Sequence, residues 1–122
     1  MIPIFVDQQL FIDAIKAENH EQIFYLLNHY GKYRLVESNS PVIRKALAMA
    51  VVFSKGEDNL RFANQYAELC YRNGTYDELI EMEDKIPRDE KKAGQAWVFL
   101  TAAFYQKRKS AKISDALRWA RT

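Results

Sequence analysis

The sequence predicts an all-α fold of about seven helices. Apolar residues recur at intervals of three and four along nearly the whole chain, which is the spacing of amphipathic helices. Only four glycines and three prolines interrupt the 122 residues, so short connections should join helices that run antiparallel to their neighbours. The first six residues are the one stretch that could form a strand instead. We expect a single domain over residues 1–122.

The first three helices follow from apolar stripes and one start signal. The stripes of the first two helices are Leu10, Phe11, Ala14 and Ile15, and then Ile23, Phe24, Leu27 and Tyr30. Ser40 suits the N-cap of a third helix, with Pro41 at the first helical position, where a missing N–H does no harm. This helix is apolar on nearly every side as far as Phe53, so we expect it to be central and buried.

Glycines and capping residues mark the next two helices. Gly56 should end the third helix, and Asp58 should cap the fourth, which Gly74 should end. Thr75 and Glu78 have the spacing of a capping box, which would satisfy the N–H groups at the start of the fifth helix.

Pro87 separates the fifth helix from the last two. We expect the fifth helix to end at Pro87 and a sixth to run from about Asp89 to Lys107. The seventh should begin near Ser110 and present an inward face made of Ile113, Ala116, Leu117 and Ala120.

Three helix corners look alike, at residues 28–37, 70–81 and 104–120. Each has aromatic side chains at a helix end before the chain reverses. When the sequence is aligned with itself so that position 70 matches position 104, Cys70-Tyr71 aligns with Phe104-Tyr105. We call this offset the repeat shift. Sequence repeats of this period are typical of stacked helical hairpins, in which no hairpin buries its apolar face alone.

The second corner carries a resemblance to a known repeat. Residues 63–82, ANQYAELCYRNGTYDELIEM, resemble a tetratricopeptide repeat, with Ala67 at the small packing position, Tyr71 as the aromatic, and Gly74 and Tyr76 at the turn. The segment is similar also to a pentatricopeptide repeat, an RNA-binding relative. The resemblance implies a short α-solenoid in which the first helix of each hairpin lines a concave groove.

A groove of this kind would be lined by one face of the fourth helix. The residues that point away from Ala63, Ala67 and Cys70 are Arg61, Asn64, Glu68, Tyr71 and Arg72. This mixture of an amide, arginines and a tyrosine suits the capture of a peptide or a carboxylate. It is also the composition of an ordinary exposed helix face.

The net charge of +2 conceals an asymmetry along the chain. Residues 1–84 hold eight Lys/Arg and thirteen Asp/Glu, whereas residues 85–122 hold ten Lys/Arg and three Asp/Glu. The acidic cluster is Asp77, Glu78, Glu81, Glu83 and Asp84. It is either a solvated helix face, with its first acids favoured by the helix N-terminus, or a patch for a basic partner.

The basic cluster lies at the last corner and in the helix after it. Trp119 points away from the face of Ile113 and Leu117, so it either contacts a partner or packs on another helix of the chain. We predict that this C-terminal surface binds a partner through Lys107, Arg108, Lys109, Lys112, Arg118 and Trp119.

Catalytic and metal-binding patterns are missing from the sequence. His20 and His29 are the only histidines and Cys70 is the only cysteine, so no metal-ligand spacing occurs. Phosphate-binding glycine loops and serine elbows are also missing, and we expect no enzyme, metal or cofactor. Cys70 shares a stripe with Ala63, which favours a buried structural cysteine over a nucleophile paired with His29.

The termini and apolar runs bear on where the protein acts. A single cysteine suits a reducing, cytoplasmic setting. The apolar run at residues 46–53 is too short to span a bilayer, and the N-terminal MIPIFV lacks the features of a signal peptide, so we expect no membrane partner. The MIPIFV segment should either pack on the first hairpin or form an interface with another chain, including a second copy.

These observations favour a non-enzymatic interaction module, such as an adaptor, scaffold or regulator that docks on a larger protein. The alternative is an RNA- or DNA-binding helical-repeat protein that uses residues 107–121. A continuous basic stripe would favour nucleic acid, whereas an isolated basic patch at one end would favour protein docking.

Overall fold

The computed structural model describes residues 8–31, 40–88 and 94–120, and within these it is helical without a strand. The elements are α1 (Gln8–Lys16), α2 (His20–Gly31), α3 (Pro41–Phe53), α4 (Gly56–Asn73), α5 (Tyr76–Glu81), the 3-10 turn η2 (Glu83–Lys85), α6 (Gln95–Gln106) and α7 (Ser110–Trp119). The predicted all-α class is therefore confirmed. The expectations for residues 1–6, for most of the corner at 28–37 and for the start of the sixth helix at Asp89 lie outside the described residues.

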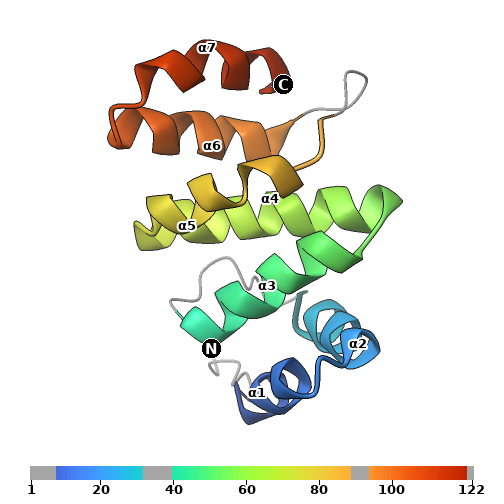
Figure 1. The fold of residues 1–122 in the computed structure, drawn as a ribbon. Helices are drawn as coiled ribbons and strands as arrows, with labels where there is room; N and C mark the ends of the chain where they lie inside the picture. The colour runs from blue at the N-terminus through green and yellow to red at the C-terminus, as the bar shows by residue number, and fades with distance from the viewer. Residues whose placement is uncertain (1–7, 32–39, 89–93, 121–122) are drawn as a thin grey trace, which may run out of the picture.

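The helices form a stack that follows their order along the chain (Figure 1). Within the described residues, the substantial contacts join helices that are consecutive or one apart, such as α1 with α3 and α4 with α6. The helix α4 lies in the middle of the stack and packs against α3, α5 and α6. This order agrees with stacked hairpins, while the solenoid itself stays a prediction.

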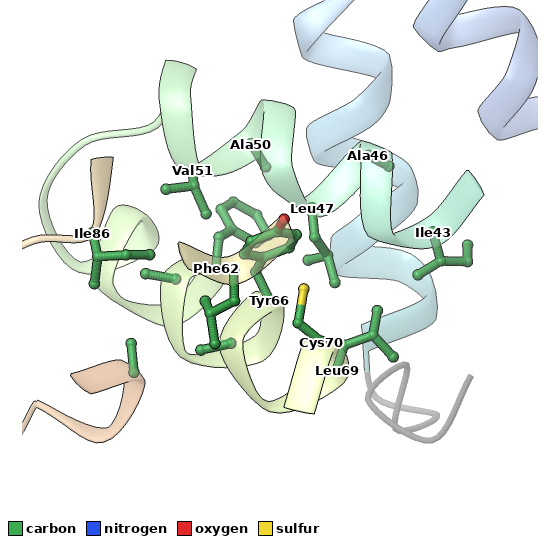
Figure 2. Packing of buried hydrophobic residues seen from close by; sticks show 14 of the residues in the cluster. Ile43, Ala46, Leu47, Ala50, Val51, Phe62, Tyr66, Leu69, Cys70 and Ile86 are labelled. Carbon is green, nitrogen blue, oxygen red and sulfur yellow. The ribbon is translucent and has the colours of Figure 1, made fainter. Parts of the chain in front are cut away.

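The core between α3 and α4 is built from facing apolar side chains (Figure 2). Ser40 caps α3 as predicted, because its hydroxyl oxygen accepts a hydrogen bond from the Ile43 N–H at 3.4 Å. The central position of α3 is not borne out on all sides, since Val52 is 59% exposed. The more central helix is α4, which buries Phe62, Ala63, Tyr66, Ala67, Leu69 and Cys70.

Two predicted caps are wrong, because their side chains have other partners. The helix α4 begins at Gly56, ahead of Asp58, whose carboxylate pairs with Arg61 at 3.0 Å. At the next corner, the Thr75 hydroxyl donates to the Cys70 carbonyl oxygen instead of capping α5. Glu78 pairs with the largely buried Arg44 of α3 at 2.9 Å, so no capping box forms.

The fifth helix also ends earlier than predicted. The helix α5 stops at Glu81 and the chain tightens into η2 before it reaches Pro87. Gly94 is the N-cap residue of α6, and the side-chain oxygen of Asn64 on α4 accepts a hydrogen bond from the Ala96 N–H at 2.9 Å. A side chain of α4 thus accepts from one of the backbone N–H groups that the start of a helix leaves without an intrahelical partner.

Three helix ends share one backbone geometry, in which a residue with positive φ ends the helix. The residues are Glu18 (φ 50°), Gly74 (φ 71°) and Arg108 (φ 57°). The N–H of each bonds to the carbonyl three residues back, and the next N–H bonds to the carbonyl five residues before it. This is the pattern of a Schellman motif, which normally favours glycine.

The last two of these corners are related by the repeat shift, which takes Gly74 to Arg108. Burial follows the same register, because Phe62, Ala63, Tyr66, Leu69 and Cys70 are buried on α4 and so are Ala96, Trp97, Leu100, Ala103 and Phe104 on α6. The pairs α4–α5 and α6–α7 therefore share their corner geometry and burial register, and we call each pair a unit.

The backbone at the end of α7 lies very close to the backbone at the start of α6. The Trp119 carbonyl oxygen at the end of α7 lies where a Cβ on Gly94 would stand. Glycine at position 94 therefore lets the end of α7 pack against the start of α6.

The corner geometry predicts opposite effects of two substitutions. Gly74→Val should lower the free energy of unfolding by about 1–2 kcal/mol, because a β-branched residue resists positive φ. A Cβ on Gly74 would meet no atom within 4 Å, so this loss comes from the backbone alone. Arg108→Gly should leave that free energy unchanged or raise it by up to about 1 kcal/mol. Urea denaturation followed by circular dichroism measures both. Equal destabilisation by the two substitutions would contradict the shared geometry.

Gly94 gives a second prediction. Gly94→Ala should lower the free energy of unfolding by about 1–3 kcal/mol, because the new methyl group forces the end of α7 away from α6. The neighbouring exposed residue provides the control, and Gln95→Ala should leave the melting temperature nearly unchanged. If both substitutions are neutral, the contact between Gly94 and Trp119 does not hold the unit together.

Candidate functional site

The corner between α6 and α7 carries the most prominent surface feature of the predicted C-terminal site. A pocket of about 440 Å³ lies there, lined by Tyr105, Gln106, Arg108, Ser110 and Ile113. Tyr105 is 72% exposed, the highest value among the exposed large apolar side chains of the described residues. We call these five residues together with Lys109 the corner surface.

The acidic and basic clusters of the sequence meet in the fold. Lys107 pairs with Asp77 of α5 at 3.3 Å, and Lys112 pairs with Glu83 of η2 at 3.3 Å. A pair as exposed as Lys107–Asp77 contributes only about 0.2–1 kcal/mol to stability. The Glu83 side chain is more sheltered, at 16% exposed, and each pair balances the charge of its lysine. The acids are therefore partners of cations in the same chain, an arrangement that neither interpretation of the acidic cluster included.

Arg108 and Lys109 are the cations of this corner that remain without a carboxylate partner in the described chain. Both are exposed, and Arg108 also lines the pocket beside Tyr105. The positive φ of Arg108 places its side chain at the turn itself. An unpaired guanidinium next to an exposed aromatic ring can bind a carboxylate and an apolar group at once.

Trp119 takes the second of its two predicted roles. It is half-buried and packs on the hydrophobic core of the chain, while the guanidinium of Arg118 lies 5.5 Å from its ring centroid. The prediction that Leu117 turns inward is wrong, because Leu117 is 57% exposed. The inward face of α7 is centred on the buried Ala116, which brings Trp119 toward the core and turns Leu117 outward.

The predicted groove residues of α4 are engaged within the fold. The side-chain oxygen of Asn64 accepts a hydrogen bond from the Ala96 N–H. The Tyr71 ring contacts the rings of Tyr76 and Phe99, with 5.6 and 5.7 Å between ring centroids. The other three form ion pairs on α4 itself, Arg61 with Asp58 at 3.0 Å and Arg72 with Glu68 at 3.7 Å. This face of α4 is thus where α6 packs.

Cys70 and His29 lie in separate surroundings. Cys70 is fully buried, as predicted, next to the Tyr66 hydroxyl and Thr75. Burial raises the pKa of the Cys70 thiol and also that of the Tyr66 hydroxyl. His29 stacks on Tyr25 and also contacts the ring of Tyr30, both of them residues of α2. Cys70 is therefore an inert core residue.

Two smaller hollows lie at the other end of the stack. One, of about 280 Å³ between α1 and α3, is lined by Ile12, Ile15, Lys16, Pro41, Val42 and Lys45. The other, of about 270 Å³, lies where the His20 ring stacks on Phe53 at 4.5 Å. Neither contains a residue of the predicted sites.

Two further properties of the described residues concern metals and membranes. No cluster of three or more histidine, cysteine, aspartate or glutamate side chains in the described chain is arranged to hold a metal ion. Among the helices of the described chain, none combines the length and the apolar character that crossing a bilayer requires.

The exposed Tyr105 was not among the residues predicted for the site, although the sequence contained a signal for it. The repeat shift takes Tyr71 to Tyr105, and in the fold Tyr71 is covered by Phe99 of the next unit. No helix of the described chain covers Tyr105 in this way. The repeat register could therefore have identified it as the uncovered aromatic of the last unit.

The buried thiol predicts a pH dependence of stability. Since the pKa of Cys70 is raised in the folded state, an unfolded thiol ionises above about pH 8.5 while the folded one keeps its proton. Stability should then fall by up to about 1.4 kcal/mol per pH unit above that pH. Cys70→Ala should remove this component, as urea denaturation between about pH 8 and 10 would measure. Identical slopes for the two proteins would contradict the assignment.

Comparison of the chain with protein-family models, with curated proteins and with solved structures returned no match. The resemblance of residues 63–82 to a tetratricopeptide repeat therefore stays a prediction from the sequence.

Proposed function

We propose that the chain is a non-enzymatic interaction module that docks on a protein partner through the corner surface. One observation carries this proposal: the most exposed of the large apolar side chains, Tyr105, shares a pocket with Arg108, a cation without a carboxylate partner in the described chain. Tyrosine and arginine are among the residues that dominate binding energies at protein interfaces. The proposal replaces Trp119, which packs on the core, with Tyr105 as the aromatic anchor.

The charge pattern favours protein docking over nucleic acid. Asp77 and Glu83 interrupt the basic cluster by pairing with Lys107 and Lys112. A protein that grips a phosphate backbone needs a longer continuous basic surface than Arg108 and Lys109 provide. The partner segment should therefore carry acidic residues next to an apolar side chain that packs on Tyr105.

Two features from the sequence support the same proposal. The tetratricopeptide resemblance belongs to a class of repeats that bind other macromolecules. The single buried Cys70 suits a reducing intracellular compartment, where we propose that the module acts as an adaptor, scaffold or regulator.

The proposal is tested by affinity capture from a native lysate with nuclease added, followed by binding kinetics on the captured protein. Tyr105→Ala should weaken binding by about 2 kcal/mol, mainly through faster dissociation. The double variant Arg108→Glu with Lys109→Glu should slow association, because these cations attract the partner at long range. Asp77→Asn with Glu83→Gln should speed association, since it frees Lys107 and Lys112.

A matched control tests whether the loss of binding is specific to Tyr105 or follows from the removal of any exposed tyrosine. Tyr25 is 60% exposed on α2, and Tyr25→Ala should leave binding unchanged. Binding that survives both corner variants would overturn the proposal. A partner that is captured only when nuclease is left out, and whose affinity falls steeply with salt, would favour the nucleic-acid alternative.

A further inference from the structure

We propose that the outer face of α6 and α7, defined by Val98, Tyr105 and Leu117, is a docking edge for a helical hairpin of an acidic partner protein. The partner hairpin would lie on the α6–α7 unit as that unit lies on α4–α5. This inference rests on the proposed function and specifies the mode of binding.

The first unit shows how such a face holds its neighbour. Among the contacts between the α4–α5 unit, with η2, and the α6–α7 unit are a hydrogen bond, a ring contact and two ion pairs made by four side chains. Asn64 accepts from the Ala96 N–H at 2.9 Å, Tyr71 contacts the Phe99 ring at 5.7 Å, Asp77 pairs with Lys107 at 3.3 Å, and Glu83 pairs with Lys112 at 3.3 Å. Successive positions along α4 thus meet successive positions of α6, so the two helices run parallel, as Figure 1 also shows.

The same positions in the second unit are apolar and uncovered. The repeat shift takes Asn64, Tyr71 and Glu83 to Val98, Tyr105 and Leu117 respectively. The exposed fractions of these three side chains are 40%, 72% and 57%. They make up half of the six exposed large apolar side chains in the described chain, the others being Leu10, Tyr25 and Val52. Exposed apolar residues gathered at the positions that hold a neighbouring unit are typical of an interaction surface.

The residue types determine what the edge would take. At the matched positions the first unit has an amide and a carboxylate, whereas the second unit has valine and leucine. The occupant must therefore present an apolar helix face. Arg108 and Lys109 lie next to Tyr105 at the corner, so the occupant should carry Asp or Glu at that end. A second copy is the weaker choice, because the corner surface carries Arg108 and Lys109 and no carboxylate, so the same surface of a second copy would offer these cations no acidic partner.

A library of helical hairpins displayed on phage, with randomised positions on one face, provides the probe. It is selected on the intact chain, and the affinities of the selected hairpins are then measured on variants. Val98→Asp and Leu117→Asp should each weaken binding at least tenfold. The matched controls are Val52→Asp and Leu10→Asp, which place the same charge on an exposed valine and leucine elsewhere and should leave binding unchanged. All four variants should keep the melting temperature of the parent chain within a few degrees.

The selected hairpins should be acidic, with an aromatic or aliphatic residue opposite Tyr105. If they lose affinity with Arg108→Glu and Lys109→Glu but not with Val98→Asp and Leu117→Asp, the docking edge is overturned while the corner surface stands. If they are insensitive to both pairs, or if no hairpin is selected, both ideas fail. A dimer of the chain that Val98→Asp dissociates would make a second copy the occupant and overturn the proposed partner.

Discussion

The helix α4 is covered by other helices on opposite sides, and the rest of the structure depends on this burial. Its large buried side chains, among them Phe62 and Tyr66, pack on α3 (Figure 2). On another side of α4, Asn64 and Tyr71 contact α6. In stacked helical hairpins no hairpin buries its apolar surface alone, and one hairpin covers a face of the hairpin before it. The α4–α5 unit is covered in this way. The corresponding face of α6–α7 is the one that the described chain leaves exposed.

Part of the charge asymmetry of the sequence is compensated inside the described part of the fold. The acids of α5 and η2 lie against the cations of the α6–α7 corner, and Glu78 reaches Arg44 on α3. These pairs join the two units, although the exposed Lys107–Asp77 pair adds little to their stability. At the described corner this leaves Arg108 and Lys109 without a carboxylate partner beside an aromatic ring, so the proposed site is narrower than the basic cluster in the sequence.

The sequence predicted those parts of the fold that depend on local signals. Ser40 with Pro41 and the left-handed Gly74 act within one helix turn, and the repeat shift of Cys70-Tyr71 onto Phe104-Tyr105 relates two corners of the same backbone geometry. Positions without a clear residue-type signal were missed. Glu18 and Arg108 adopt positive φ without being glycine, and the small Ala116, not Leu117, sets the inward face of α7. Ion pairs between segments far apart in the sequence, such as Asp77 with Lys107, carry no local pattern at all.

The central claim is that α5 and η2 hold the α6–α7 unit and thereby occupy Lys107 and Lys112 but not Lys109. Acylation of lysines by a soluble active ester, followed residue by residue with mass spectrometry, measures this most directly, because an ammonium held by a carboxylate reacts more slowly. The account predicts that Lys109 reacts fastest of the three. It also predicts that Asp77→Asn speeds labelling of Lys107 and Glu83→Gln speeds that of Lys112, each leaving Lys109 unchanged. Equal rates for all three lysines, unaffected by either substitution, would contradict it.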